Sequence, residues 1–330
     1  MPRQCNHDFT PEPEQMALWP DASGNTINGL GEAAERRASL VYWHDPETLA
    51  FGQVQKWFYT YNHSPEVDAA RAERAEILEQ PLPAVAPERA ERSPEDWSRL
   101  VKERALAASA DIVGITRLKA EWLFEGVDFG WTWVVMLGVA MDYDEMMTAP
   151  EPTAGAEVVR QYGRGAKAAK GLAGWLRREG WDAGPVTGPL AGDLLLIPPA
   201  LACGFGELGK HGSIINRALG ACFRLSAVVT NVPLVADEED SFGADEFCVN
   251  CRICDDACPP GAILHDKQLV RGARKWYVDF DKCLPYFNQT FGCGICVAVC
   301  PWSRPGVAEG LIEKLARRRA RLRPSPKDTG

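Results

Sequence analysis

The chain has 330 residues, of which 46% are hydrophobic and 25% are charged, and its formal net charge is −9. That length allows one large domain or two moderate ones with a substantial core, whereas the acidic balance argues against a general nucleic-acid-binding role, which needs a basic surface. No apolar run is long enough to span a bilayer, and residues 1–22 lack a basic region followed by an apolar one. We therefore expect a cytoplasmic protein.

The first 96 residues are expected to form an N-terminal region and a linker. Up to about residue 78 the pattern indicates irregular structure, which includes an aromatic stretch at 57–61. Residues 79–96 are rich in proline and charge, as is typical of a linker or a surface crossover. The next block is therefore expected to begin at Trp97.

Residues 97–237 are predicted to form an α/β layered domain. Ser93 is placed to cap a helix that has Glu95 and Asp96 in its first turn, and Gly180 is placed to end a later helix rich in Ala and Lys. Short apolar runs between the helical segments indicate strands, and this alternation favours the α/β class. We expect helices at 97–109, at 157–179 and, with a glycine-rich turn, within 204–217, and strands at 111–116, 133–141, 193–197 and 225–230.

Eight of the eleven cysteines lie within a stretch of 53 residues near the C-terminus. The first run has the spacing Cys-x2-Cys-x2-Cys-x3-Cys-Pro from Cys248 to Pro259, and the second has Cys-x2-Cys-x3-Cys-Pro from Cys293 to Pro301. This is the bacterial ferredoxin spacing, in which the fourth cysteine of a run ligates the other cluster. Residues 238–305 are therefore expected to form a ferredoxin-like domain with two [4Fe–4S] clusters.

The crossing rule assigns four cysteines to each cluster. Zinc is the alternative, but eight cysteines with no partnering histidine do not favour it. Nearby glycines allow the backbone to approach the clusters closely, so that amide N–H groups can hydrogen-bond to the sulfur atoms. The remaining Cys5, Cys203 and Cys222 are expected to be buried structural thiols. One cluster is predicted to take Cys248, Cys251, Cys254 and Cys300, and the other Cys258, Cys283, Cys293 and Cys296.

Residues 306–330 are expected to form a basic C-terminal tail. From residue 304 onward the chain has eight Lys or Arg and three Asp or Glu, a local excess of five positive charges. A solvated helix end is the favoured explanation of this excess. A docking site for an acidic electron donor is the alternative.

Several segments resemble the reductive dehalogenase family, in the same order over about residues 97–305. They are Ala110–Thr116 (ADIVGIT), Gly204–Gly212 (GFGELGKHG) with the following Ser-Ile-Ile-Asn, Val229–Leu234 (VTNVPL) and Cys293–Trp302 (CGICVAVCPW). Epoxyqueuosine reductase, a tRNA-modifying relative of that family, shares the Gly-x-Gly-x-x-Gly-Lys pattern and the clusters.

The resemblance implies a nitroreductase-like core at 97–237 that binds a corrinoid (cobalamin) in its base-off form. Two [4Fe–4S] clusters pass electrons to cobalt, which attacks or accepts the halogen of an organohalide; halide leaves and a proton replaces it. The sequence has no Asp-x-His-x-x-Gly motif, and base-off binding in this family needs none. The residues implied to bind the cofactor are Gly204, Gly206, Gly209, Lys210, His211, Gly212 and Asn216.

The resemblance also implies a tyrosine proton donor on the helix that precedes the corrinoid-binding stretch. Tyr162 lies at the matching place, and a phenol gives up its proton more easily beside a cation. Arg224, near the start of a predicted strand, is the first choice for that cation and Lys210 the second. His211 is an alternative acid, because histidine titrates near neutrality.

The leading hypothesis is therefore a corrinoid-dependent reductive dehalogenase that acts on a small aromatic or otherwise unsaturated organohalide. We expect it to take electrons from an external ferredoxin- or flavodoxin-type donor. Epoxyqueuosine reductase is the second hypothesis, although only ten positions separate Cys283 from Cys293, where that enzyme carries a longer insertion. A non-enzymatic iron–sulfur electron-transfer protein is the third.

Overall fold

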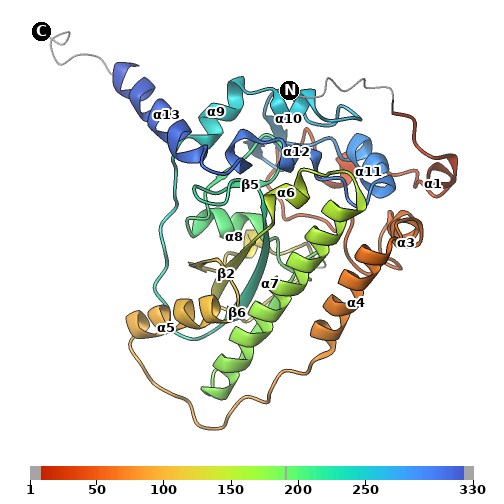
Figure 1. Ribbon diagram of the computed structural model, residues 1–330. Helices are drawn as coiled ribbons and strands as arrows, with labels where there is room; N and C mark the ends of the chain where they lie inside the picture. The colour runs from red at the N-terminus through yellow and green to blue at the C-terminus, as the bar shows by residue number, and fades with distance from the viewer. Residues whose placement is uncertain (1–8, 190–191, 323–330) are drawn as a thin grey trace, which may run out of the picture.

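The computed structural model describes residues 9–189 and 192–322. At its centre lies a four-stranded antiparallel sheet with the strand order β1-β2-β6-β3 (Figure 1). The strands predicted at 111–116, 133–141 and 225–230 are confirmed as members of this sheet. Its strands are β1 (Ile112–Arg117), β2 (Trp133–Ala140), β3 (Ala183–Thr187) and β6 (Phe223–Thr230).

Both faces of the sheet are covered. On one face, Val135 and Leu137 of β2 pack in a core with α5 (Pro94–Ala107) and α7 (Pro152–Arg178). On the other face, alternate β2 residues pack with the segment around α8 (Ile197–Ala202). Because successive side chains of a strand point to opposite faces, a strand covered on both sides is apolar along its whole length, and β2 is.

Helices α5 and α7 confirm two predictions. The Ser93 Oγ accepts the backbone N–H of Asp96 at 3.1 Å and caps α5. Helix α7 begins earlier than expected because Pro152 occupies its first position, where the missing proline N–H leaves no bond unmade. Gly180, with φ of 80°, follows its end. Helix α7 packs on β2, β3 and β6, and α4 (Pro65–Glu79) runs beside it (Figure 1).

The prediction of irregular structure before residue 78 is wrong. The described part of this region contains α1 (Pro13–Ala17), α2 (Gly24–Ile27), α3 (Gly52–Tyr61) and α4. The start of α4 has a clear sequence signal, since Ser64 caps it and Pro65 takes its first position. The linker expected before α5 is present as a segment without regular structure.

The prediction of a helix within 204–217 is also wrong. This segment forms a small hairpin of β4 (Glu207–Leu208) and β5 (Ile214–Ile215). Gly204 and Gly206 have φ of 84° and 123°, which an α-helix does not allow.

The prediction of a strand at 193–197 is wrong as well. Leu194 makes a single isolated bridge to Leu123, and the chain then enters α8. Pro198 lies in the first turn of α8, where proline is tolerated in a helix.

The cysteine-rich part of the chain is built of short elements. Its described elements are α9 (Ala244–Asn250), α10 (Ile253–Asp256), β7 (Gln268–Val270), β8 (Ala273–Lys275), α11 (Phe280–Gln289), α12 (Ile295–Ala298) and a 3-10 turn, Pro301–Ser303. Other short helices are α6 (Tyr143–Met146) and a 3-10 turn at Ala120–Trp122. The N-terminal segment packs on this part, because Asp281 of α11 accepts hydrogen bonds from Ser23 and Gly24.

The basic tail continues as α13 (Ala308–Leu322), which extends away from the cysteine-rich part in Figure 1. Its Arg319 pairs with Glu246 of α9 at 2.8 Å. Residues 323–330 lie outside the described part of the chain. None of the helices within 9–189 and 192–322 has the length and apolar character needed to cross a bilayer.

Candidate active site

The eight cysteines of the array come together in two neighbourhoods. Burial raises the pKa of Cys254, and three nearby thiols raise it further, those of Cys248, Cys251 and Cys300. Burial likewise raises the pKa of Cys283 to about 12, with Cys293 and Cys258 as its thiol neighbours. The structure thus brings together residues of each predicted ligand set.

The two neighbourhoods adjoin each other at Cys296. Burial raises the pKa of this thiol well above its ordinary value, and the thiols of both neighbourhoods raise it further, Cys254 among them. The two predicted cluster positions are therefore adjacent.

The surroundings of these sulfurs fit iron–sulfur clusters. The backbone N–H of Ala262 donates to Cys258 Sγ at 3.3 Å, and backbone hydrogen bonds lower the pKa of Cys248 and Cys300 against the effect of burial. Such N–H···S bonds tune cluster potentials. Among the residues described, no group of three or more His, Cys, Asp or Glu is arranged around a single metal-ion position.

Two of the three remaining cysteines are buried, as predicted. Cys203 and Cys222 are 5% and 4% exposed, and burial raises the pKa of both thiols. Cys5 lies outside the described residues.

Lys210 lies beside the cluster cysteines. Its side chain is 1% exposed, and Nζ donates to the backbone carbonyl of Cys251 at 2.7 Å. The same nitrogen lies 3.4 Å from His265 Nδ1 and 5.3 Å from the ring centroid of Trp276. Lys210 does not line either cavity that contains Tyr162.

The glycine-rich stretch packs mainly against protein. A Cβ on Gly204 would lie 2.6 Å from the Glu238 carbonyl oxygen, and one on Gly206 would lie 2.0 Å from the Ile215 carbonyl oxygen. Asn216 Nδ2 donates to the carbonyl of Phe205 at 3.0 Å. Gly206 therefore allows close backbone approach within the β4–β5 hairpin, and Gly204 allows it against the segment at Glu238.

The end of this stretch reaches a cavity. His211 is buried, its Nδ1 accepts the N–H of Ser213, and its Nε2 has no hydrogen-bond partner. Burial lowers the pKa of His211 to about 4, so the ring is neutral. A Cβ on Gly209 would clash with His211, and Ser213 lines the cavity that also contains Arg224.

Tyr162 and Arg224 meet at a cavity of about 150 Å³. Tyr162 projects from α7 and Arg224 from β6, and the guanidinium carbon lies 5.5 Å from the phenol ring centroid. Gly188 packs on the same ring, since a Cβ there would lie 2.6 Å from it. Arg224 Nε is buried without a hydrogen-bond partner. The first-choice cation of the sequence prediction is thus beside Tyr162, and the second choice is beside the cluster cysteines.

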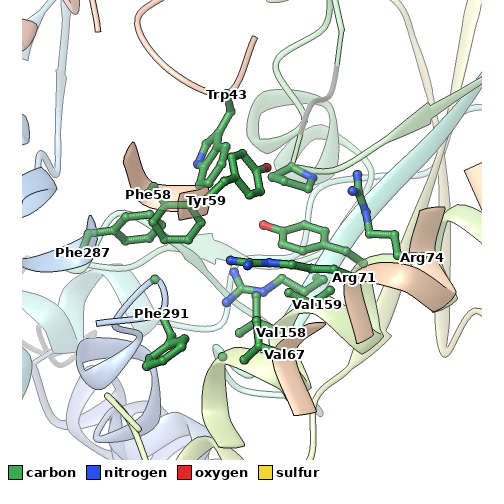
Figure 2. Close-up of a pocket in the computed structure, with 15 residues that line it drawn as sticks. Trp43, Phe58, Tyr59, Val67, Arg71, Arg74, Val158, Val159, Phe287 and Phe291 are labelled. Atoms are coloured by element: carbon green, nitrogen blue, oxygen red, sulfur yellow. The ribbon is translucent and has the colours of Figure 1, made fainter. Parts of the chain in front are cut away.

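The cluster-binding part of the chain forms one wall of this cavity. Phe291 and Gly292 line it and directly precede Cys293, and Phe287 lines it from α11. Figure 2 shows Phe287 and Phe291 on the side of the cavity opposite Arg74. Two residues of the aromatic stretch at 57–61, Phe58 and Tyr59, complete this wall.

Two further cavities adjoin the first. One, of about 390 Å³, shares Trp43, Tyr162, Pro189 and Arg224 with it and is otherwise mainly apolar. The other, of about 470 Å³, shares His44 and Gly192 with the second. Buried His44 Nδ1 has no hydrogen-bond partner. The 390 Å³ cavity is thus a mainly apolar hollow, and the 470 Å³ cavity also has polar residues on its lining.

Two residues of this site have no signal in the sequence. Arg71 and Arg74 of α4 line the cavity around Tyr162, yet α4 reads as a polar surface helix rich in Ala, Glu and Arg. Their role at the cavity follows only from the packing of α4 beside α7.

Residues 247–303 match the family model described as a 4Fe-4S dicluster domain. The cysteine array is therefore of this class, and the two clusters predicted from its spacing are confirmed.

Curated relatives match the sequence over a wider region. A tetrachloroethene reductive dehalogenase of Desulfitobacterium hafniense is 31% identical over 184 residues, 52% of this chain and 33% of that protein. An epoxyqueuosine reductase of Cyclobacterium marinum is 31% identical over 122 residues, 32% of this chain and 36% of that protein. The chain thus spans about a third of the length of these relatives.

Solved structures show the same kinship in the fold. The catabolic reductive dehalogenase NpRdhA in complex with 3-bromo-4-hydroxybenzoic acid superposes with a TM-score of 0.77 at 23% identity, over 93% of this chain and 48% of that one. A reductive dehalogenase structure described in terms of B12-dependent dehalogenation gives 0.70 at 22% identity, over 93% and 47%. The predicted resemblance is confirmed: this chain is related to the reductive dehalogenases and has their mixed α/β fold, and the epoxyqueuosine reductases are a related family.

Proposed function

We propose that the chain is the catalytic part of a corrinoid-dependent reductive dehalogenase. The observation that carries this proposal is the cavity around Tyr162, which has a phenol and a guanidinium on one side and the loop into Cys293 on the other. A proton donor and an electron-transfer centre thus face one small space. The kinship with tetrachloroethene reductive dehalogenases supports the same reaction.

The corrinoid of this reaction fits the two larger cavities. The 390 Å³ cavity is lined mainly by apolar side chains, as suits the face of a macrocycle, and the 470 Å³ cavity also has the polar side chains of Asp45, Gln55 and Lys56 on its lining. Ser213, at the end of the glycine-rich stretch, lies on the same lining. A corrinoid bound there would supply the redox chemistry that joins the clusters to the carbon–halogen bond. The residues that would hold it include Leu40, His44, Leu195, Leu196, Ile197, Ser213 and Leu225.

The residues of this chain then handle the proton. Replacement of halogen by hydrogen consumes two electrons and one proton and releases one halide ion. The Tyr162 hydroxyl supplies the proton to the carbon that loses halide, and the Arg224 guanidinium beside it stabilises the phenolate that remains. Lys210 is assigned to the cluster rather than to this step, because it is buried against Cys251.

Several finer assignments belong to this proposal. They are the nitroreductase-like topology of the core, the base-off state of the corrinoid, the cytoplasmic location and an external ferredoxin- or flavodoxin-type donor. The contacts of Gly204, Gly206 and Asn216 with protein support a role in shaping the cofactor cavity rather than in direct contact. The proposed domain division of the chain is an N-terminal region and linker at 1–96, the core at 97–237, the ferredoxin-like domain at 238–305 and the basic tail at 306–330.

The test is anaerobic reconstitution with iron, sulfide and cobalamin, followed by desalting and electron paramagnetic resonance (EPR). We expect cobalt to remain bound together with both clusters, and a halophenol to lose halide under low-potential reduction. Tyr162→Phe should lower the rate of halide release by about 100-fold or more with both EPR signals unchanged, whereas Tyr61→Phe, at a residue 44% exposed, should not. Clusters without retained cobalt would instead indicate an electron carrier.

Epoxyqueuosine reductase is the second candidate, supported by the 122-residue match to that family. It predicts that the reconstituted protein reduces epoxyqueuosine in a tRNA stem-loop. The net charge of −9 does not favour a tRNA substrate. Parallel assays with the stem-loop and a halophenol separate the two candidates.

A further inference from the structure

The two clusters lie in a definite order relative to the cavities. The second cluster reaches the cavity around Tyr162, because Phe291 and Gly292 line that cavity and lead into Cys293. Among the described residues that line the three adjoining cavities, none lies within 238–280 or 294–305, which contain the cysteines of the first cluster. Electrons bound for the cavities therefore have to enter at the first cluster, the one predicted to take Cys248, Cys251, Cys254 and Cys300.

Helix α13 covers the surroundings of this first cluster. Leu315 is buried in one core with Cys248 and Cys300, and Leu311 and Ile312 pack against the same core. The outer side of α13 is thus separated from these cluster ligands by about the width of one helix, roughly 10–12 Å.

The outward side of α13 is basic. Residues 304–322 contain six Lys or Arg and two Glu, on a chain whose formal net charge is −9. Lys314, Arg318 and Arg321 are spaced by four and three positions, so they share a face of the helix. All three are exposed, and no carboxylate among the described residues forms an ion pair with them, whereas Arg317 and Arg319 are paired.

An exposed apolar side chain lies beside this basic helix. Val249 is 50% exposed and directly follows Cys248 on α9. Glu246, three positions before it and so its neighbour on the helix surface, pairs with Arg319 of α13 at 2.8 Å, and Figure 1 shows the two helices next to each other. The surface outside the first cluster therefore combines an apolar contact point with a cationic helix.

We propose that α13 and Val249 form the docking surface for a small acidic protein that donates one electron at a time. The basic face attracts and orients the donor, and Val249 is the point of contact nearest to the first cluster. The donor is oxidised by one electron, the first cluster is reduced by one, and no bond is formed or broken. That the electrons end in an organohalide rests on the proposed function, whereas the docking needs only the clusters.

The acidity of the rest of the chain makes this surface selective. An acidic donor is repelled by a molecule of formal net charge −9 except where positive charge is concentrated, so its approach is directed to α13. The sequence alone favours a solvated helix end for the basic tail. The packing of α13 over the first cluster supports the donor site instead.

A protein is favoured over an anionic membrane as the occupant of this surface. A membrane-surface helix inserts a free apolar face into the lipid. The apolar residues Leu311, Ile312 and Leu315 of α13 are instead packed on the core of the first cluster, which leaves the charged face for a partner.

The test is anaerobic stopped-flow mixing of the cluster-loaded protein with the hydroquinone form of a flavodoxin, a small acidic one-electron donor. Loss of one electron leaves the flavodoxin semiquinone, whose absorbance gives the second-order rate constant. We expect this constant to fall by about tenfold or more between low salt and about 0.3 M salt, because salt screens the attraction between opposite charges.

Charge removal on α13 tests the basic face. Arg318→Gln/Arg321→Gln should lower the rate constant at low salt by about fivefold or more and weaken its salt dependence. Arg99→Gln/Arg178→Gln is the matched control, because it removes the same charge from exposed positions of α5 and α7 and should lower the constant by less than about twofold. Figure 1 shows α5 far from α13.

A second pair of variants tests the apolar contact. Val249→Glu should lower the rate constant for flavodoxin, whereas Val235→Glu, at a valine that is 44% exposed, should not. Reduced methyl viologen is a small reductant that needs no docking surface. The cluster EPR spectra and the rate of reduction by methyl viologen should match wild type in every variant, which separates lost docking from lost structure.

Three results would overturn the proposal. The first is a flavodoxin rate constant that does not change with salt, and the second is equal rate constants for Arg318→Gln/Arg321→Gln and its control. The third comes from sedimentation with phosphatidylglycerol vesicles. Binding to vesicles that is lost in Arg318→Gln/Arg321→Gln, with an unchanged flavodoxin rate, would assign the basic face to a membrane.

The experiment contains neither corrinoid nor organohalide, so its outcome is independent of dehalogenation. If flavodoxin reduces the clusters as expected and no halophenol loses halide, the proposed function fails and the docking surface is retained. If halide is released with reduced methyl viologen and the flavodoxin rate is indifferent to the α13 variants, the docking surface fails and the proposed function is retained.

Discussion

Asn62 Oδ1 accepts the backbone N–H of Phe291 at 2.8 Å, and this bond ties the end of α3 to the loop that leads into Cys293. Asn62 is 1% exposed, and its Nδ2 donates to the carbonyls of Phe58 and Asn288. One buried amide therefore joins the N-terminal helices, the cluster-binding part and the cavity wall.

Replacement of Asn62 by Leu should destabilise this junction. The change leaves the Phe291 N–H and the Asn288 carbonyl without their side-chain partner, at a cost of about 1–3 kcal/mol for each unmade bond, whereas the Phe58 carbonyl keeps the backbone N–H of residue 62. We expect a lower unfolding temperature and faster loss of cluster absorbance in chelator. Asn231→Leu is the control, because Asn231 is exposed and bonds to Thr132 and Gly130. Equal unfolding temperatures for Asn62→Leu and wild type would show that the bond does not hold the loop.

The crossed assignment of the cysteines predicts a pairing of phenotypes. Cys300→Ala and Cys248→Ala should remove the same cluster, and Cys296→Ala should remove the other. Each variant should lose about half of the iron, since each of the two [4Fe–4S] clusters holds four of the eight iron atoms. Iron analysis and the EPR spectrum of the surviving cluster provide the measurement. Identical surviving spectra for Cys300→Ala and Cys296→Ala would contradict the crossing.

Lys210 should raise the reduction potential of the nearby cluster. It is a buried cation whose Nζ contacts the Cys251 carbonyl, and a positive charge stabilises the more negative, reduced state of a cluster. We expect Lys210→Met to shift that cluster to a lower potential in an EPR-monitored titration.

Lys267 provides a matched control for this prediction. Its Nζ also lies 5.3 Å from the Trp276 ring centroid, but it pairs with Asp245 at 2.7 Å. Lys267→Met should therefore change the potential much less. A Lys210→Met protein with wild-type potentials would assign Lys210 a packing role only.

His211 should make the folded state sensitive to mild acid. Burial lowers its folded-state pKa to about 4 from an ordinary value of 6.5, so the unfolded chain binds the proton more readily between these two values. The free energy of unfolding should fall as the pH drops below about 6.5, by about 1.4 kcal/mol per pH unit from this residue. Above pH 6.5, His211 should not make the free energy of unfolding depend on pH.

The measurement is the unfolding temperature of wild type and His211→Gln from pH 7.5 to 5.5. The gap between the two should move in favour of the variant as the pH falls. His63→Gln is the control, because His63 is exposed. A gap that stays constant over this range would show that His211 is already solvated or protonated.

The predictions that the structure confirms were based on residue patterns within single segments of the chain. The cysteine spacing depends on the geometry of one cluster-binding loop, and the strand at Trp133–Ala140 is apolar along its length because both of its faces are covered. The α5 helix is marked by its Ser93 cap. In each case the signal is a pattern of residue types within one short segment, so it is visible in the sequence even where the contacts behind it are distant.

The failures depend on contacts between distant residues or on backbone angles. Arg74 reaches the Gly188 carbonyl 114 positions away, and nothing in the composition of α4 marks it as part of a cavity. The glycines of 204–212 look compatible with a turn and a helix, but the positive φ of Gly204 and Gly206 creates a hairpin instead. The proximity of Tyr162 and Arg224 follows from the packing of α7 on β6.

Phe291 and Gly292 belong at once to the cavity wall and to the approach to Cys293. Oxidative loss of that cluster would release the loop that its cysteine anchors, and one side of the cavity would open to water. Under the proposed function, such a molecule would lose substrate binding and electron delivery together, because one loop serves both.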